Sequence, residues 1–157
     1  MRNLVRYSVL SASLLASACY SSAGDVETNG LAAASVIRYG TSFGMCAGYC
    51  REDLQIDGGQ IKLTRSSWDP RQPTRVEELS ISPDAWRKLQ ATLNGVAIAD
   101  MDSVYGCPDC ADGGAEWVEI ENGSSKKRVT FEFSKSPARL RAAVTELRAL
   151  RQRFPPR

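Results

Sequence analysis

The chain has no histidine and no long hydrophobic run. Histidine is the commonest general base and a frequent ligand of catalytic zinc, so its absence excludes Ser–His and Cys–His dyads and most catalytic zinc sites. A transmembrane helix needs about 20 apolar residues in a row, and the longest apolar stretch, near the start of the chain, is shorter than this. We therefore assign no catalytic residue, no metal ligand and no cofactor.

The chain also lacks a marked excess of charge of either sign. It carries 20 basic and 18 acidic residues, and Arg2 and Arg6 are the only charged residues before Asp25. Loss of the first 18 residues would leave 18 residues of each sign. A neutral domain has no basic field that would recruit nucleic acid, so we expect no nucleic-acid partner.

The N-terminus does carry a recognisable leader. Arg2 and Arg6 form a basic stub, residues 9–15 are mostly apolar, and Ala16-Ser17-Ala18-Cys19 closes the segment in small residues. This order is typical of a secretory signal. We predict that residues 1–18 are a signal peptide and that the protein is exported.

The leader can be removed in two ways. Ala16-Ser17-Ala18 fits the small-x-small rule of an ordinary signal peptidase, which would release a secreted protein. The same cut leaves Cys19 at the new N-terminus, as in bacterial lipoproteins, whose terminal thiol is acylated; Ala16 stands where lipoproteins usually carry Leu. We favour a periplasmic or membrane-anchored protein lipidated at Cys19, with residues 19–34 as an anchor and flexible tether.

The remaining residues, 35–157, predict one domain. Alternating apolar residues predict strands at 36–41, 52–57, 60–65, 76–81, 116–120 and 128–133, with turns at Gly58-Gly59 and Asn122-Gly123. Ser82-Pro83 opens a helix that Gly95 ends, and Ser136-Pro137 opens another that Pro155-Pro156 stops. Residues 96–114 are predicted to be irregular.

This element order predicts an α+β fold, with an antiparallel sheet of about five or six strands built from hairpins and two helices packed on one face. No helix connects the first four strands, so parallel crossovers are not expected there. We expect a monomer. The arginines of the last helix could lie against anionic lipid or an acidic partner. We favour a solvated face, where they suit the helix macrodipole.

Four cysteines in two close pairs, Cys46 with Cys50 and Cys107 with Cys110, form the main chemical feature of the domain. We favour structural disulfides, because small exported domains with an even number of cysteines use them. Pairing within each loop and pairing between the loops are both open. The alternatives are a four-cysteine zinc site and a redox-active Cys107-Pro108-Asp109-Cys110, which would require the first thiol at a helix N-terminus.

Several other residues form a predicted binding loop region. Asp109, Asp112 and Glu116 could offer oxygens to Ca²⁺, but their spacing matches no fixed calcium loop, and turn formation explains the Asp-Gly-Gly run equally well. Trp117 follows directly and is interpreted as a core or edge residue.

The run Phe43-Gly44-Met45-Cys46-Ala47-Gly48-Tyr49, with an alternating strand and a Gly turn after it, resembles a family of small exported bacterial domains of unknown function. Members often show Cys-Phe-Gly-x-Cys-Pro-x-Tyr; here Ser42 and Ala47 replace the first Cys and the Pro. The block from Cys107 to Trp117 also looks like a recurrent block of close relatives. The resemblance implies a fold and an exported location, but no activity.

Together these observations predict a non-enzymatic cell-envelope domain that binds another envelope component. The predicted binding loop contains Phe43, Gly44 and Tyr49, with Asp109, Asp112, Glu116 and Trp117 beside it. An inhibitor of an envelope hydrolase is one version of this hypothesis. A thiol-redox or metal-dependent enzyme that uses the cysteine pairs is the alternative.

Overall fold

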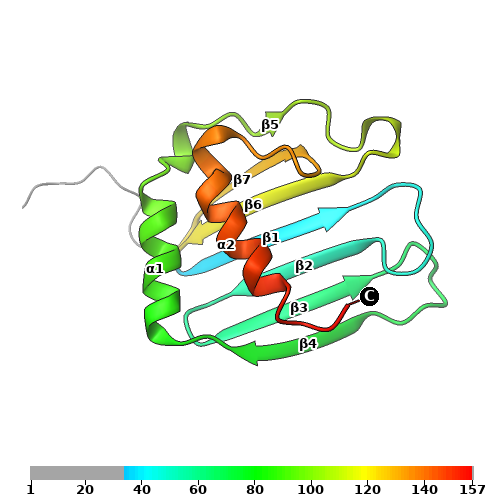
Figure 1. Cartoon of the computed structure of the whole chain (residues 1–157), viewed down its shortest axis with the longest axis horizontal. Helices are drawn as coiled ribbons and strands as arrows, with labels where there is room; N and C mark the ends of the chain where they lie inside the picture. The colour runs from blue at the N-terminus through cyan, green and yellow to red at the C-terminus, as the bar shows by residue number, and fades with distance from the viewer. Residues whose placement is uncertain (1–33, 157) are drawn as a thin grey trace, which may run out of the picture.

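In the computed structural model of the chain, the described residues are 34–156. The predicted signal peptide, Cys19 and the tether up to residue 33 lie outside them. The described part forms a sheet and two α-helices (Figure 1). The strands are β1 (Val36–Ser42), β2 (Arg51–Ile56), β3 (Gln60–Ser66), β4 (Arg75–Ser80), β5 (Val104–Tyr105), β6 (Ala115–Asn122) and β7 (Ser125–Glu132), and the helices are α1 (Pro83–Asn94) and α2 (Arg141–Arg151).

The sheet has the strand order β4-β3-β2-β1-β6-β7-β5. All neighbouring strands are antiparallel except β5 and β7. The α+β class and the antiparallel hairpins are therefore confirmed, and each of the six predicted strands is present. The predicted strand number was too low, because the two-residue strand β5 lies in the stretch predicted to be irregular.

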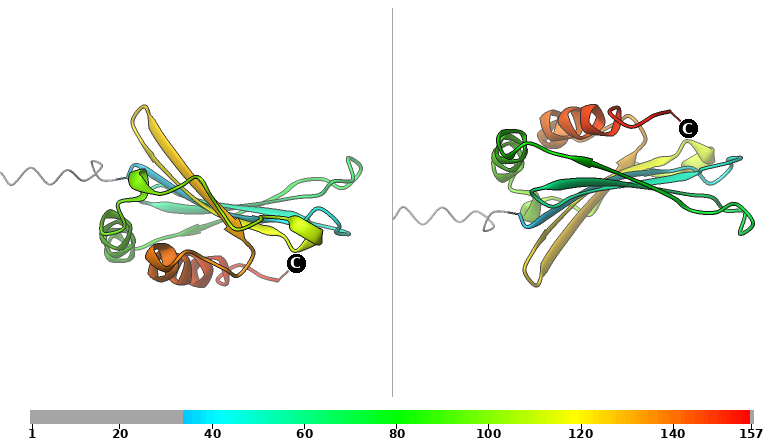
Figure 2. Two further views of the ribbon diagram at one scale, coloured as in Figure 1. Left: turned by 90° about the horizontal axis from the view of Figure 1, so that it is seen from above. Right: turned by 90° about the horizontal axis from the view of Figure 1, so that it is seen from below.

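Both helices lie on the same face of the sheet, and no helix or strand of the described residues covers the opposite face (Figure 2). Period-two alternation points every second strand residue toward the helices. The core therefore joins strand residues such as Ile37, Leu54 and Val118 to the helix residues Leu89 and Leu147, all of them buried. Burial of this apolar surface is the main stabilising contribution to the fold.

The two helices begin differently. Ser82 caps α1 as predicted, since its hydroxyl accepts a hydrogen bond from the backbone N–H of Ala85, and Pro83 occupies the first helical position. The same cap was predicted at Ser136-Pro137, and this was wrong. The chain enters α2 through a 3₁₀ turn at Ala138–Leu140, and no side chain caps the start of α2.

Candidate functional site

One end of the helix-facing surface of the sheet is polar rather than apolar. Strand register places Arg65 of β3 beside Glu52 of β2, Glu52 beside Thr41 of β1, and Thr41 beside Glu116 of β6. All four residues are buried. Because buried charges are stable only when paired, this row requires partners from the layer above it.

Helix α2 supplies two of these partners. Arg148 holds the Glu116 carboxylate through two hydrogen bonds, from Nε at 2.8 Å and from Nη2 at 2.6 Å. The Tyr39 hydroxyl and the backbone N–H of Ser134 donate to the same carboxylate. Two oxygens that accept four donors leave Glu116 with little remaining capacity for a further partner.

Glu52 is held in the same way at the next turn of the helix. Arg151 donates to it from Nε at 2.8 Å and from Nη2 at 2.6 Å. Arg65, which is completely buried, donates from Nε at 2.9 Å, and it also contacts Glu77 and the carbonyl of Pro155. These three arginines and three glutamates form an ion-paired cluster between α2 and the sheet, and the exposed Arg75 also pairs with Glu77, at 2.9 Å.

These contacts correct the prediction for the last helix. Arg148 and Arg151 do not lie on a solvated face but reach inward to buried carboxylates. Sequence periodicity contained a signal for this, because Arg148 lies four residues after Val144 and Arg151 four after Leu147, and both apolar residues are buried. Neither arginine is available for anionic lipid.

The hydroxyl of Tyr39 is part of this cluster. Burial, together with its hydrogen bond to the negatively charged Glu116, raises the pKa of Tyr39 well above its ordinary value. The hydrogen bonds to Glu116 similarly raise the pKa of Arg148. At neutral pH both groups therefore keep their protons.

The raised Tyr39 pKa predicts a loss of stability in alkali. A tyrosine whose folded-state pKa exceeds its unfolded value holds its proton more tightly in the folded state, so the free energy of unfolding falls as pH rises above about 10. Urea unfolding midpoints at about pH 9 and pH 11 would measure this fall. Tyr39→Phe should reduce the slope, whereas parallel slopes for the two proteins would contradict the assignment.

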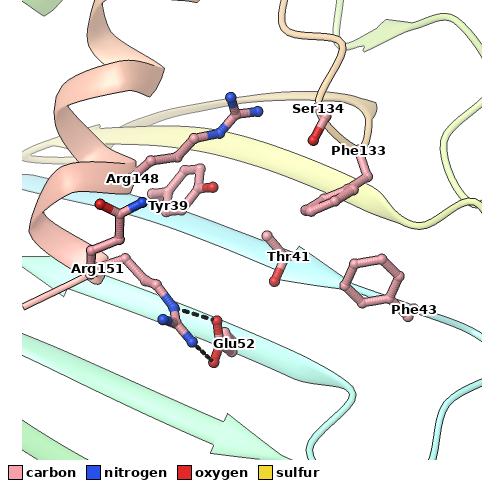
Figure 3. A pocket seen from close by; sticks show the side chains of 9 residues that line it. Tyr39, Thr41, Phe43, Glu52, Phe133, Ser134, Arg148 and Arg151 are labelled. Carbon is pink, nitrogen blue, oxygen red and sulfur yellow. Dashed lines mark hydrogen bonds and ion pairs between the residues drawn. The ribbon is translucent and has the colours of Figure 1, made fainter. Parts of the chain in front are cut away.

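Beside the cluster lies a cavity of about 380 Å³ (Figure 3). Arg148, Arg151 and Gln152 line it from the helix, and Tyr39, Thr41 and Glu52 line it from the strands. Phe43, Phe133 and Ser134 complete it at the strand ends. The two phenylalanine rings meet edge to face, with centroids 4.9 Å apart, and form an apolar wall opposite the charged groups.

Thr41 is the unusual residue of this cavity. It is only 6 % exposed, and its hydroxyl oxygen has no hydrogen-bond partner among the described residues. In Figure 3 it lies between the phenylalanine rings and the Arg151–Glu52 pair. A buried hydroxyl without a partner destabilises a protein by about 1–3 kcal/mol, and a ligand that bonds to it would recover part of this.

The cysteines pair within their own loops. Cys46 is bonded to Cys50, and Cys107 to Cys110, with Cα–Cα distances of 5.6 and 5.5 Å. Structural disulfides persist in oxidising compartments, which indicates that the protein is not cytoplasmic. Local bridges close short loops and constrain the unfolded chain little, so their role is to shape the loops.

The Cys107–Cys110 loop needs such a constraint. Asp109, Ala111 and Asp112 all have positive φ angles, of 61°, 50° and 59°. Each non-glycine residue in this region costs of order 1–3 kcal/mol. Cys107 does not begin an α-helix, because only the 3₁₀ turn Cys110–Asp112 follows it, so the helix dipole that lowers the pKa of redox-active thiols is missing.

The disulfides should differ in how easily they are reduced. Cys107 and Cys110 are both exposed, whereas Cys46 is half-buried and Cys50 is only 1 % exposed. Attack by a thiolate needs access to a sulfur atom, so a mild reductant should open Cys107–Cys110 first. Alkylation at increasing reductant concentration, followed by peptide mass mapping, measures the order. Equal or reversed labelling would contradict it.

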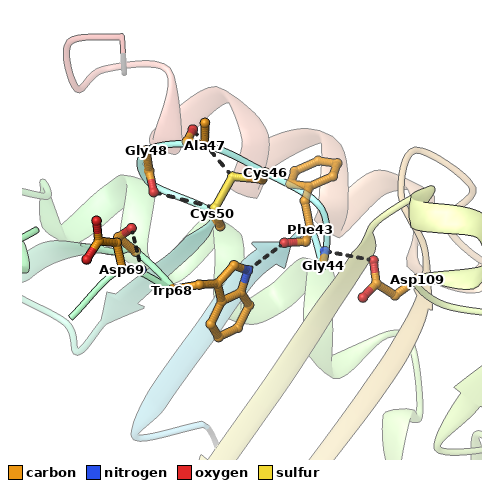
Figure 4. The surroundings of a disulfide bond; sticks show 10 residues. Phe43, Gly44, Cys46, Ala47, Gly48, Cys50, Trp68, Asp69 and Asp109 are labelled. Atoms are coloured by element: carbon orange, nitrogen blue, oxygen red, sulfur yellow. Dashed lines mark hydrogen bonds between the residues drawn. A yellow bond between two sulfur atoms is a disulfide. The ribbon is translucent and has the colours of Figure 1, made fainter. Parts of the chain in front are cut away.

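The predicted binding loop is tied to other loops at the same end of the sheet (Figure 4). The backbone N–H of Gly44 donates to Asp109 at 3.2 Å, and the Trp68 indole donates to the carbonyl of Phe43 at 2.8 Å. The Tyr49 hydroxyl donates to the carbonyl of Pro73 at 3.2 Å. These contacts, together with Cys46–Cys50, hold Phe43 at the mouth of the cavity.

The remaining residues of the predicted binding loop region lie in different parts of the structure. Asp112 lies beside Gly44, since a Cβ built on that glycine would stand 3.6 Å from a carboxylate oxygen of Asp112. Glu116 belongs to the buried row, and Trp117, its neighbour in β6, points to the opposite face of the sheet, where it lies over Gly40. Within residues 34–156 no group of three His, Cys, Asp or Glu residues is placed to hold a metal ion.

The sequence analysis missed most residues of the cavity. Tyr39, Thr41 and Phe133 were assigned to strands, and Ser134 to no element or site. Alternation along β2 is a sequence signal for the row, because Glu52 lies on the same face of the strand as the apolar residues Leu54 and Ile56, which are buried. Alternation along the strand does not say which part of the chain covers the row.

Comparison of the chain with protein-family models finds no match, and comparison with curated proteins finds no significant similarity. The resemblance to a family of small exported domains therefore stays a prediction. In the part of the chain that the structure describes, no helix is long and apolar enough to cross a membrane.

Proposed function

We propose that this protein is an exported, non-enzymatic binding domain whose ligand occupies the cavity between α2 and the sheet. The observation that carries the proposal is the cavity of about 380 Å³ with an aromatic wall and a buried, unpartnered hydroxyl. Ligand pockets typically have volumes of about 300–1,000 Å³ and combine apolar walls with a few placed polar groups.

The state of the ionisable groups favours binding over catalysis. A general base must be free to take a proton near neutral pH. Glu52 and Glu116 are each held by an arginine through two hydrogen bonds, and the raised pKa keeps Tyr39 protonated. These groups are suited to holding a rigid pocket rather than to moving protons.

The leader and the disulfides together support an extracytoplasmic site of action. We propose that residues 1–18 are removed and that Cys19 carries a lipid, so that residues 19–34 tether the domain to a membrane. The ligand would then be a component of the cell envelope. Cleavage without lipidation would give the same domain in secreted form.

The test is to map bound ligands by chemical-shift perturbation in ¹H–¹⁵N NMR spectra of the purified protein. The probe set is a small-molecule library that contains sugars, amino acids, dipeptides, carboxylates and inorganic phosphate. We expect ligands to perturb the backbone amides of Thr41, Phe43 and Ser134 together. A library without a hit, or hits that perturb only the uncovered face of the sheet, would contradict the proposal.

A matched pair of variants checks the location. Phe133→Ala removes part of the aromatic wall, and this side chain is exposed enough for the fold to tolerate its loss. Val104→Ala removes another exposed apolar side chain that does not line the cavity. Only Phe133→Ala should weaken binding.

A further inference from the structure

The charges around the cavity cancel. The two arginines that line it are both paired with buried carboxylates, Arg148 with Glu116 and Arg151 with Glu52. An anionic ligand would find no unpaired cation in this cluster, and it would approach the Glu52 carboxylate that lines the cavity. Transfer of a charged group from water into such a site is unfavourable, so the cavity favours a neutral ligand.

The polar groups that remain both donate and accept hydrogen bonds. Three residues that line the cavity carry such groups: Thr41, whose buried hydroxyl has no hydrogen-bond partner among the described residues, and Ser134 and Gln152, which are exposed and offer a hydroxyl and an amide to water or a ligand. Hydroxyls and amides can act in either direction. A ligand that satisfies them needs several groups of the same dual character, which is the property of a sugar.

The aromatic wall of Phe43 and Phe133 suits the apolar faces of a sugar ring. A sugar ring carries C–H groups on its faces, which pack against aromatic rings, while its hydroxyls point outward. Phe43 and Phe133 stand opposite the arginine-bearing end of α2 (Figure 3). The cavity thus has an apolar side and a polar side.

The position of the cavity disfavours a peptide. Extended peptides bind most readily along an exposed sheet edge, where unpaired backbone groups are free. The floor of this cavity is β1, which pairs with β2 on one side and with β6 on the other. The strand that carries Thr41 therefore offers no edge to a peptide backbone.

From these four features we infer that the cavity binds a neutral sugar residue, and this inference rests on the proposed function. The hydroxyl of Thr41 bonds to a sugar hydroxyl, Phe43 and Phe133 contact the ring, and the paired arginines keep the polar side rigid. The ligand is a free sugar or one residue of a longer glycan.

The experiment titrates the purified protein with named probes and follows the amides of Thr41, Phe43 and Ser134 by NMR. The probes are glucose, N-acetylglucosamine and its trimer, with glucuronate as the matched anion and the dipeptide Ala-Ala as the peptide probe. We expect at least one neutral sugar to perturb all three amides and glucuronate to bind about tenfold more weakly than glucose. Binding of the trimer without its monomer would identify a glycan as the ligand, and binding of the monomer a free sugar.

Two variants make the test specific. Thr41→Val replaces the buried hydroxyl by a methyl group of the same size, so the fold should persist, and sugar binding should weaken about tenfold. Thr64→Val makes the same exchange on β3, at a position that points away from the helices, and should leave binding unchanged.

The outcomes separate this inference from the proposed function. If glucuronate or Ala-Ala perturbs the three amides and no neutral sugar does, the ligand class is wrong and the cavity remains a binding site. If sugars perturb only other residues, or no sugar binds while the library yields a cavity ligand of another class, the inference is overturned. If no probe of any class reaches the cavity, the proposed function fails as well.

Discussion

Replacement of Gly40 by alanine is expected to destabilise the protein by about 3 kcal/mol or more. The Trp117 side chain lies directly over this glycine, and a Cβ at position 40 would stand 2.1 Å from Cζ2 of the indole ring and 2.6 Å from the carbonyl oxygen of Glu52. Atoms cannot approach this closely, so either the ring or strand β2 would have to move. Urea unfolding of both proteins measures the change.

The indole has little room to move aside. It is 4 % exposed, and the guanidinium groups of Arg51 and Arg128 lie over it, 5.3 and 5.2 Å from its centroid. Cation–π contacts of this kind contribute about 0.5–1 kcal/mol each, and displacement of the ring would lose both. Trp117 is thus a structural residue of the uncovered face, not part of the cavity.

Gly59→Ala is the matched control. A Cβ added at position 59 would meet no heavy atom within 4 Å apart from its chain neighbours, and the φ angle there is not in the left-handed region. The change should shift stability by less than about 0.5 kcal/mol. Equal effects of Gly40→Ala and Gly59→Ala would show that Trp117 does not pack on β1 as described.

Replacement of Arg65 by methionine is the second change with a large expected effect, about 3–5 kcal/mol of lost stability. Arg65 is wholly buried, and it donates to Glu52, to Glu77 and to the carbonyl of Pro155. Its loss removes buried hydrogen bonds to two carboxylates, leaves Glu52 to Arg151 and Glu77 to the exposed Arg75, and removes the contact that ties the end of the chain to β3. Methionine keeps most of the volume, so the effect reports the lost hydrogen bonds and ion pairs.

The control for this change is Arg71→Met. Arg71 also forms an ion pair, with Asp69 at 2.8 Å, but its side chain is 88 % exposed. Water already screens such a pair, so we expect no measurable change in the urea midpoint. Glu77 keeps Arg75 as a partner at 2.9 Å after Arg65→Met, so adding Glu77→Gln should not recover the lost stability. Equal urea midpoints for Arg65→Met and Arg71→Met would contradict the buried role of Arg65.

Local sequence patterns predicted most of the fold. The hairpin of β2 and β3 was found because its alternation and its Gly58-Gly59 turn are adjacent in the chain. Strand β5 was missed for the opposite reason. Val104–Tyr105 is too short to show a period, and it becomes a strand only by pairing with β7, more than twenty residues later.

Local sequence patterns did not predict the cavity. Alternation along β2 and β6 assigns Glu52 and Glu116 to the inner face, yet it does not say what covers them. Arg148 and Arg151 reach these carboxylates only because the second half of α2 crosses the polar end of the sheet. That placement depends on the packing of the whole helix, which no short window of sequence contains.

Local sequence patterns did not decide the cysteine pairing either. The spacing allowed bridges within or between the two loops, and the choice depends on how far apart the folded loops lie. Strand β1 and the β5–β6 connection bring the loops to one end of the sheet, where Gly44 meets Asp109. The loops are joined there by a hydrogen bond, whereas each disulfide stays within its own loop.

The functional account depends on the protein being exported and oxidised, and the intact mass of the protein purified from its native cells tests this most directly. The account predicts loss of residues 1–18, a gain of lipid mass at Cys19, and four thiols that react with an alkylating reagent only after reduction. A full-length chain whose cysteines react without reduction would place the domain in a reducing compartment and contradict the account.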